Sequence, residues 1–167
     1  MLLKKNGYVL EQLYSPLIVH TTPEHEELKI LARQCITRYH VHHYLGFAQS
    51  QWQLFSKQNP PKVKPLLYIY RVLLTGIYLM EIGILEANLV ELNKNFNLTY
   101  VSDLITCKLA GAEKAVLPNI NLTFHQQEYE RLCNQLREAS QNSSLPETPN
   151  CKAELNDLLI RIRLQFS

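Results

Sequence analysis

Five polar side chains recur at spacings of four and three residues within residues 63–82, a stretch that is otherwise mostly apolar. They are Lys64, Tyr68, Arg71, Thr75 and Tyr78. On an α-helix, at about 100° per residue, these positions share one narrow face. Because the remaining positions are apolar nearly all round, we expect this stretch to be the central, buried helix. A charge carried into such a helix needs a partner, since burying it uncompensated is very costly.

This polar face has two interpretations. It is the solvent-facing side of the helix, or it meets carboxylates such as Glu26, Glu27 or Glu86. Alternatively, Lys64 and Arg71 face an anion such as a phosphate, and the tyrosines bond to it or stack on it. Arginine suits two-point recognition of phosphate, and lysine acts as a point charge.

Three histidines, His40, His42 and His43, form a second candidate group. A metal site on a helix favours histidines four residues apart together with a further ligand. The offsets here are two, one and three, and no acidic residue occurs in residues 28–80. We therefore predict no metal site in this group.

Two arginine–histidine pairs resemble the spacing found in a family of small helical ribonucleases. Arg33 precedes His40 by seven residues, and Arg38 precedes His43 by five. A ribonuclease would require Arg33 and His40 to converge in a cleft. The other interpretation is that these are polar residues of the surface or of an interface.

The acidic residues restrict the chemistry further. Thirteen of fifteen are Glu, and only Asp103 and Asp157 are Asp, so the sequence has no Asp-x-Asp pair. Chemistry built on two clustered aspartates is therefore excluded from this chain, and we identify no catalytic residue. The net charge of +2 gives no basis for a nucleic-acid claim.

The cysteines and the hydropathy pattern bear on the compartment. The four cysteines form no C-x-x-C motif and no zinc-binding spacing, so we expect reduced thiols. The first residues do not form a signal peptide. The most apolar stretch, residues 66–82, is interrupted by Arg71 and Glu81 and is shorter than the roughly 20 apolar residues of a membrane span. We expect a cytoplasmic protein with no membrane association.

Periodicity and capping signals predict an all-α helical bundle of about five to seven helices. No stretch shows the clean alternation of a strand. The expected elements are Tyr8–Tyr14, a helical stretch over Glu24–Asn59 with a break near Gly46, Val63–Ile82, Glu86–Phe96, Ser102–Leu109, a helix from a capping box at Thr123 to about Ala139, a loop near 140–150, and Lys152–Gln165.

Three blocks of sequence also carry a resemblance to a known family. They are Asn6–Leu17, His42–Ala48 and Lys64–Ile77, the last continuing through residues 86–89. In this order they resemble the C-terminal half of predicted nucleotidyltransferases of the DNA polymerase beta superfamily, of the bacterial type associated with RNA repair. The resemblance covers about residues 2–110. Residues 111–167 are then a C-terminal helical extension.

The resemblance implies a catalytic palm with a Gly-Ser motif and an Asp-x-Asp pair that holds two Mg²⁺ ions, followed by a helical half that helps to hold the nucleotide. This sequence contains neither motif. The expectation is a truncated or split nucleotidyltransferase whose chain holds no cofactor, with Mg²⁺ and a nucleoside triphosphate bound only if a palm is supplied. The residues expected to bind nucleotide, weakly, are Lys64, Tyr68, Arg71, Thr75 and His43.

The same resemblance leaves the partner open. The helical half pairs with a separate palm subunit, or it associates with itself through apolar surface near Tyr8–Val19. In the second case the protein is a non-catalytic interaction module, which is the main alternative function.

Overall fold

The computed structural model describes residues 1–111, 117 and 120–165. Within these residues every regular element is a helix, which confirms the all-α fold. The described residues form eight α-helices, one more than the upper end of the prediction, and two short 3₁₀ helices. The elements are η1 (Leu2–Lys4), α1 (Gly7–Leu13), α2 (Pro23–Arg33), η2 (Arg38–His40), α3 (Val41–Phe55), α4 (Val63–Ile82), α5 (Leu89–Phe96), α6 (Thr99–Ala110), α7 (Leu122–Asn142) and α8 (Lys152–Gln165).

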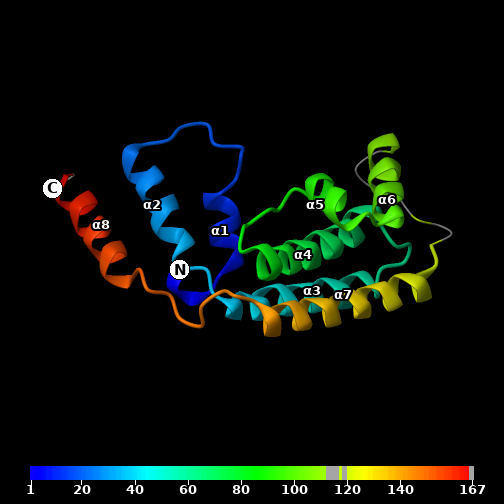
Figure 1. The fold of residues 1–167 in the computed structure, drawn as a ribbon. Coiled ribbons are helices and arrows are strands. Elements are labelled where there is room, and N and C mark those ends of the chain that lie inside the picture. Colours follow the sequence, from blue (N-terminus) through cyan, green and yellow to red (C-terminus); the bar gives the residue numbers. More distant parts are fainter. Residues whose placement is uncertain (112–116, 118–119, 166–167) are drawn as a thin grey trace.

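The long helices α3, α4 and α7 lie side by side, and α5 and α6 pack against α4 (Figure 1). At the other end of the molecule α2 packs against α8, close to the N-terminus. The helix α4 therefore has neighbours on most of its sides, as its apolar composition predicts.

The bounds of α4 agree with the expected Val63–Ile82. The helix ends at Gly83, whose φ of +75° is a left-handed conformation that favours glycine, and the Gly83 N–H donates to Leu79 O at 3.0 Å. Among the described helices α4 alone is long and apolar enough to cross a membrane, but 67% of its most apolar window is buried inside the protein.

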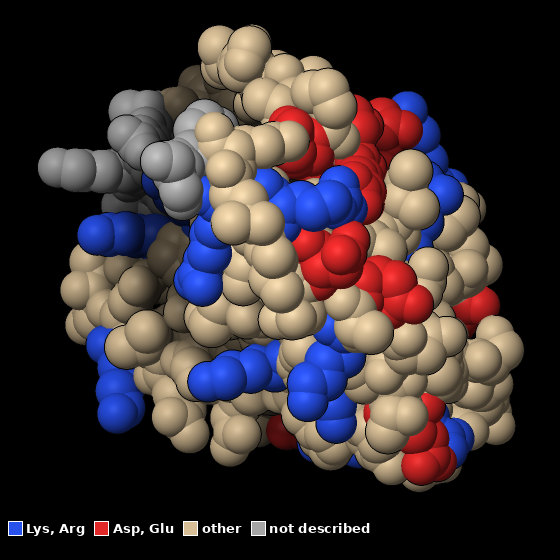
Figure 2. All heavy atoms as spheres, turned by 90° about the vertical axis from the view of Figure 1, so that its left-hand side faces the viewer, with Lys and Arg blue, Asp and Glu red and all other residues tan. Residues whose placement is uncertain are grey.

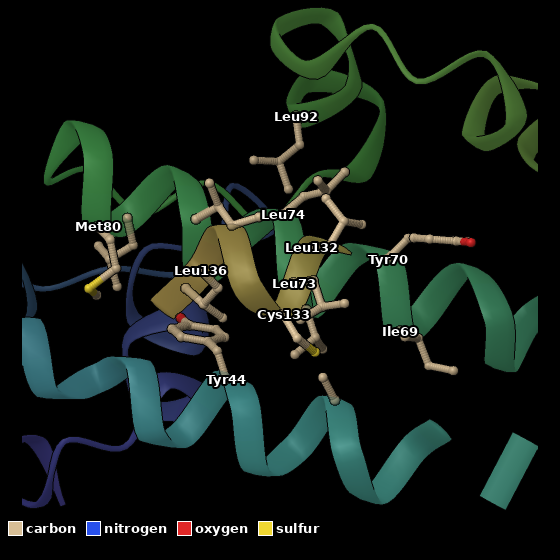
Figure 3. Packing of buried hydrophobic residues seen from close by; sticks show 14 of the residues in the cluster. Tyr44, Ile69, Tyr70, Leu73, Leu74, Met80, Leu92, Leu132, Cys133 and Leu136 are labelled. Carbon is tan, nitrogen blue, oxygen red and sulfur yellow. The ribbon is translucent and has the colours of Figure 1, made fainter. Parts of the chain in front are cut away.

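Helices α3, α4 and α7 meet at Gly76. A Cβ atom at Gly76 would lie 2.9 Å from Tyr44 Cβ on α3 and 3.1 Å from Leu136 Cδ2 on α7. Figure 3 shows Tyr44 and Leu136 pointing toward each other next to α4. The missing side chain at this position allows the three helices to approach closely.

The predicted helical stretch over Glu24–Asn59 is divided, and not near Gly46. Helix α2 ends at Arg33, and a new start follows at Thr37, where the Thr37 N–H donates to His40 Nδ1 at 3.1 Å. Gly46 lies inside α3, where a Cβ would meet no described atom within 4 Å. The expected break was wrong because the reciprocal bonds of Thr37 and His40 set the boundary.

The start of α7 also differs from the prediction. Asn121 caps it, with its side chain accepting from Phe124 N at 3.0 Å, in place of Thr123. The helix continues to Asn142, and the loop near 140–150 is accordingly shorter.

The expectation of four reduced thiols was wrong for two of the cysteines. Cys35, just after α2, and Cys151, just before α8, form a disulfide with a Cα–Cα distance of 6.3 Å. Both are fully buried. Cys107 and Cys133 are free. The disulfide joins residues 116 positions apart and fixes the beginning of α8 to the end of α2.

An apolar groove lies between η1, α1, α2 and α8. Its volume is about 860 Å³, and leucines and other aliphatic side chains form most of its lining. Figure 2 shows the side of the molecule that carries α2, α8 and the N-terminus. It is hollowed, with Lys and Arg side chains around the hollow and Asp and Glu side chains gathered mostly to one side.

The close approach at Gly76 predicts opposite effects of two glycine substitutions. Gly76→Ala should lower the free energy of unfolding by about 1–3 kcal/mol, because the added methyl group collides with Tyr44 and Leu136. Gly46→Ala is the matched control and should raise it by up to about 1 kcal/mol, because alanine is the better helix former at an open position. Urea denaturation measures both. Stabilisation by Gly76→Ala would contradict the three-helix contact.

The disulfide predicts a difference between the two pairs of cysteines. Cys35→Ala or Cys151→Ala should lower the free energy of unfolding in oxidising buffer by about 2–4 kcal/mol, because the unfolded chain is no longer cross-linked. Cys107→Ala should leave it nearly unchanged. Peptide mapping without reductant should recover the Cys35 and Cys151 peptides linked. If an alkylating reagent labels all four cysteines after the oxidised protein is unfolded without reductant, the assignment is wrong.

Candidate functional site

An ion pair between α1 and α4 is the centre of the candidate site. Arg71 Nη1 donates to Glu11 Oε2 at 2.7 Å. The Arg71 side chain is 18% exposed and that of Glu11 is 12% exposed. Burial alone would lower the pKa of Arg71, but Glu11 and Tyr68 together raise it above its usual value. The positive charge is therefore retained.

The sequence offered a carboxylate or an anion as the partner of this arginine. The structure shows a carboxylate, but it comes from Glu11 and not from Glu26, Glu27 or Glu86. Glu26 instead bonds to Lys29, and Glu27 bonds to Arg161.

Aromatic rings surround the arginine. The Arg71 guanidinium carbon lies 4.6 Å from the centroid of the Tyr68 ring. Phe47 meets Tyr68 edge-on at 5.5 Å, and Tyr8 lies 5.0 Å from both Phe47 and His43. We call Tyr8, His43, Phe47 and Tyr68 the aromatic cluster. Each of these rings, and Arg71 itself, is only partly buried.

The sequence of α1 accounts for its position over this cluster. Asn6 caps the helix by accepting from Tyr8 N at 3.0 Å. Gly7 follows, and a Cβ there would lie 2.6 Å from His43 Cδ2. Glycine thus permits the beginning of α1 to lie directly on α3. Tyr8 and Glu11 are three residues apart and so project from the same side of α1.

Burial determines the charge state of the cluster. It lowers the pKa of His43, an effect that Glu11 partly opposes. Burial also raises the pKa of the Tyr8 phenol, and the neighbouring Tyr68 and Glu11 raise the pKa of Tyr8 further. These directions favour uncharged His43 and Tyr8 rings at neutral pH, beside the positive charge of Arg71. The arrangement suits stacking and hydrogen bonding rather than acid–base catalysis.

The other predicted site residues lie at different depths. Thr75, one turn after Arg71, is fully buried, and its hydroxyl has no hydrogen-bond partner among the described residues. Lys64 is exposed in the first turn of α4, two turns or about 10 Å before Arg71. Tyr78 lines a separate hollow together with Arg131. The structure therefore brings His43, Tyr68 and Arg71 together, places Lys64 along the same helix, and puts Thr75 in the interior.

The pair proposed for a ribonuclease does not share an open site. Arg33 is exposed at the end of α2, whereas His40 is fully buried. Since His40 Nδ1 accepts from Thr37, the neutral ring carries its proton on Nε2, which is buried without a partner among the described residues. Burial lowers the pKa of His40, and the nearby His43 and Lys5 lower it by smaller amounts. This geometry gives no support to the ribonuclease alternative.

The residues present do not fit the pair of Mg²⁺ ions that the resemblance implies. In the described part of the chain, no three His, Cys, Asp or Glu side chains come together in a way that could hold a metal ion. Asp157 lies on α8 and bonds to Arg161, and Asp103 is exposed on α6.

Comparison with protein families adds to this geometry. The RNA repair pathway DNA polymerase beta family matches residues 1–161. The chain belongs to this family. The match extends well beyond the predicted limit near residue 110 and includes most of the region that the sequence set apart as an extension. Within the family region lie all four rings of the aromatic cluster as well as Glu11 and Arg71.

A relative is found in Methanocaldococcus jannaschii, where the protein is described as uncharacterized. The two are 29% identical over 169 residues, which is 99% of this chain and 68% of the relative. The rest of the relative lies outside the match. No solved structure matches the chain.

Sequence reasoning found Arg71, Tyr68 and His43 but missed Glu11, Tyr8 and Phe47. One signal was present for Glu11, since it is the only acidic residue among residues 1–23 and lies in the first block of the resemblance. Tyr8 lies in the same block, and Phe47 lies in the second.

The ion pair predicts a coupling that a double-mutant cycle can measure. Glu11→Gln leaves a mostly buried guanidinium without its counter-charge and should lower the free energy of unfolding by about 2 kcal/mol, the usual cost of losing a hydrogen bond to a charged group. Arg71→Met should cost less in the Glu11→Gln background than in the wild type, with a coupling of about 1–2 kcal/mol. Urea denaturation of the four proteins supplies the cycle. Additive losses would show that the two side chains do not stabilise each other.

Proposed function

We propose that this chain is the helical, nucleotide-binding part of a nucleotidyltransferase that acts in RNA repair. Membership of the RNA repair pathway DNA polymerase beta family supports the reaction class. The observation that carries the site is Arg71, held by Glu11 against the ring of Tyr68 beside three more aromatic rings.

Each part of the cluster has a role in this proposal. The partly exposed rings of Tyr8, His43, Phe47 and Tyr68 offer faces and edges on which a nucleobase stacks. Glu11 accepts from one of the five N–H groups of the guanidinium, at Nη1, so Arg71 is oriented by Glu11 and still has donors for a phosphate oxygen. Lys64, about 10 Å along the same helix, adds a second cation at the span of a polyphosphate.

The transfer step depends on groups that this chain does not provide. Phosphoryl transfer of this class uses metal ions held by clustered carboxylates to neutralise charge on the phosphates. The sequence has no Asp-x-Asp pair. We propose that a palm, supplied by further polypeptide or by a separate subunit, provides the metal site, and that this chain supplies the helical half.

A non-catalytic interaction module is the second candidate function, and one observation favours it. The apolar groove of about 860 Å³ at η1, α1, α2 and α8 is open, and Leu17 and Val19, between α1 and α2, are 87% and 102% exposed. The first part of the predicted association surface, by contrast, is packed, since Leu10 and Leu13 are buried. Light scattering that shows a stable dimer without nucleotide binding would favour this candidate.

The nucleotide site predicts selective effects on ATP binding. ATP should shift the amide NMR signals of α3 and α4 near His43, Tyr68 and Arg71, with millimolar affinity that weakens as salt increases. Arg71→Lys keeps a positive charge for Glu11 but removes the planar fork, and should reduce the shifts several-fold. Lys64→Gln should reduce them as well.

Lys152→Gln is the control, since Lys152 lines the apolar groove and not the aromatic cluster. It should leave the ATP-induced shifts unchanged. Equal losses from all three variants would indicate diffuse attraction of charge and would contradict a site at Arg71.

A further inference from the structure

A small hollow beside the aromatic cluster is lined mostly by basic and aromatic side chains. It has a volume of about 360 Å³ and is lined by Lys4, Lys5, Asn6, Tyr39, His42 and His43. Four of these six side chains are lysine or histidine, and none is acidic. His43 also belongs to the aromatic cluster, so the hollow and the proposed nucleotide site share a wall.

The rings and cations of this hollow are arranged in a stack. Lys5 Nζ lies 4.4 Å from the centroid of the Tyr39 ring. The rings of Tyr39 and His42 are nearly parallel, at 12°, with centroids 6.0 Å apart. His42 is exposed, so the stack ends in a ring that faces water. A further planar ring can continue it.

The local charge is not neutralised by the carboxylates of the adjoining segments. In the part of the chain that the structure describes, Glu11 is bonded to Arg71, and Glu147 is bonded to Arg38. No ion pair of the described residues involves Lys4 or Lys5. The net charge of the whole chain is only +2, but these cations are concentrated at one place.

We propose that this hollow binds a single-stranded nucleic acid, with a base stacked on His42 and phosphates bound by Lys4 and Lys5. Stacking on aromatic rings together with lysine contacts to the backbone is the chemistry by which proteins hold unpaired strands. Given the proposed function, on which this inference rests, the strand is the RNA that accepts the nucleotide. The shared wall at His43 places its bound end beside the nucleotide.

The test uses a fluorescein-labelled single-stranded RNA of about 12 nucleotides, whose anisotropy is measured with the full chain at several salt concentrations. The paired substitution Lys4→Gln with Lys5→Gln should weaken binding at least about tenfold at low salt. It should also reduce the slope of log K against log salt by about 1.4, which corresponds to about 0.7 for each of two phosphate contacts. His42→Ala should weaken binding about fivefold or more by removing the stacking ring.

The matched control is Lys57→Gln with Lys108→Gln, which removes the same charge from two exposed lysines, one just after α3 and one on α6. It should change the affinity less than about twofold, because most of the phosphate attraction is local. Circular dichroism and thermal midpoints check that every variant is folded. If the two paired substitutions weaken binding equally, if His42→Ala has no effect, or if the wild type does not bind the RNA at low salt, the proposal is overturned.

ATP titration of the same variants separates this inference from the proposed function. The Lys4 and Lys5 variant should keep its ATP-induced shifts at Tyr68 and Arg71. If the wild-type protein binds ATP but does not bind the RNA, only the RNA site is overturned. RNA binding without any ATP site at Arg71 would overturn the proposed function and, with it, the assignment of the strand as the acceptor.

Discussion

One buried charge determines the arrangement around the candidate site. Arg71 projects from a helix that is buried along most of its length, and an arginine in that position is tolerated only with a counter-charge. Glu11 supplies it, which requires α1 to lie across α3 and α4. Gly7 makes the close approach of α1 possible, and the same approach brings Tyr8 against His43 and Phe47. The ion pair and the aromatic cluster are thus consequences of a single packing arrangement.

The rest of the fold holds α4 and α1 in place. Helices α3 and α7 meet α4 at Gly76, and α5 and α6 pack against another part of α4 (Figure 1 and Figure 3). At the other end, the Cys35–Cys151 disulfide and the ion pair of Arg161 with Glu27 fasten α8 to α2. The helix α8 then forms one wall of the apolar groove. The helix α1 thus contributes Glu11 to the ion pair with Arg71 and Val9 to the lining of the apolar groove.

Local signals in the sequence predicted the elements better than their contacts. The apolar run and Gly83 gave the bounds of α4, and the spacing of Tyr68 and Arg71 placed them on one face. The division at Thr37 was missed because a histidine completes the cap where Glu or Gln is usual. The pairing of Glu11 with Arg71 and the Cys35–Cys151 bond could not be predicted, because each joins residues far apart in the chain, 60 and 116 positions respectively. Such pairings depend on the tertiary fold and leave no periodic trace in the sequence.

The central claim, that the α1–α3–α4 cluster holds a nucleotide, is tested most directly by photocrosslinking with 8-azido-ATP followed by mass spectrometry of the peptides. The account predicts adducts concentrated in peptides that contain Tyr8, His43 or Tyr68, and their loss when unlabelled ATP is added in excess. Adducts spread over surface tyrosines of α6 and α7, or adducts that excess ATP does not remove, would contradict it.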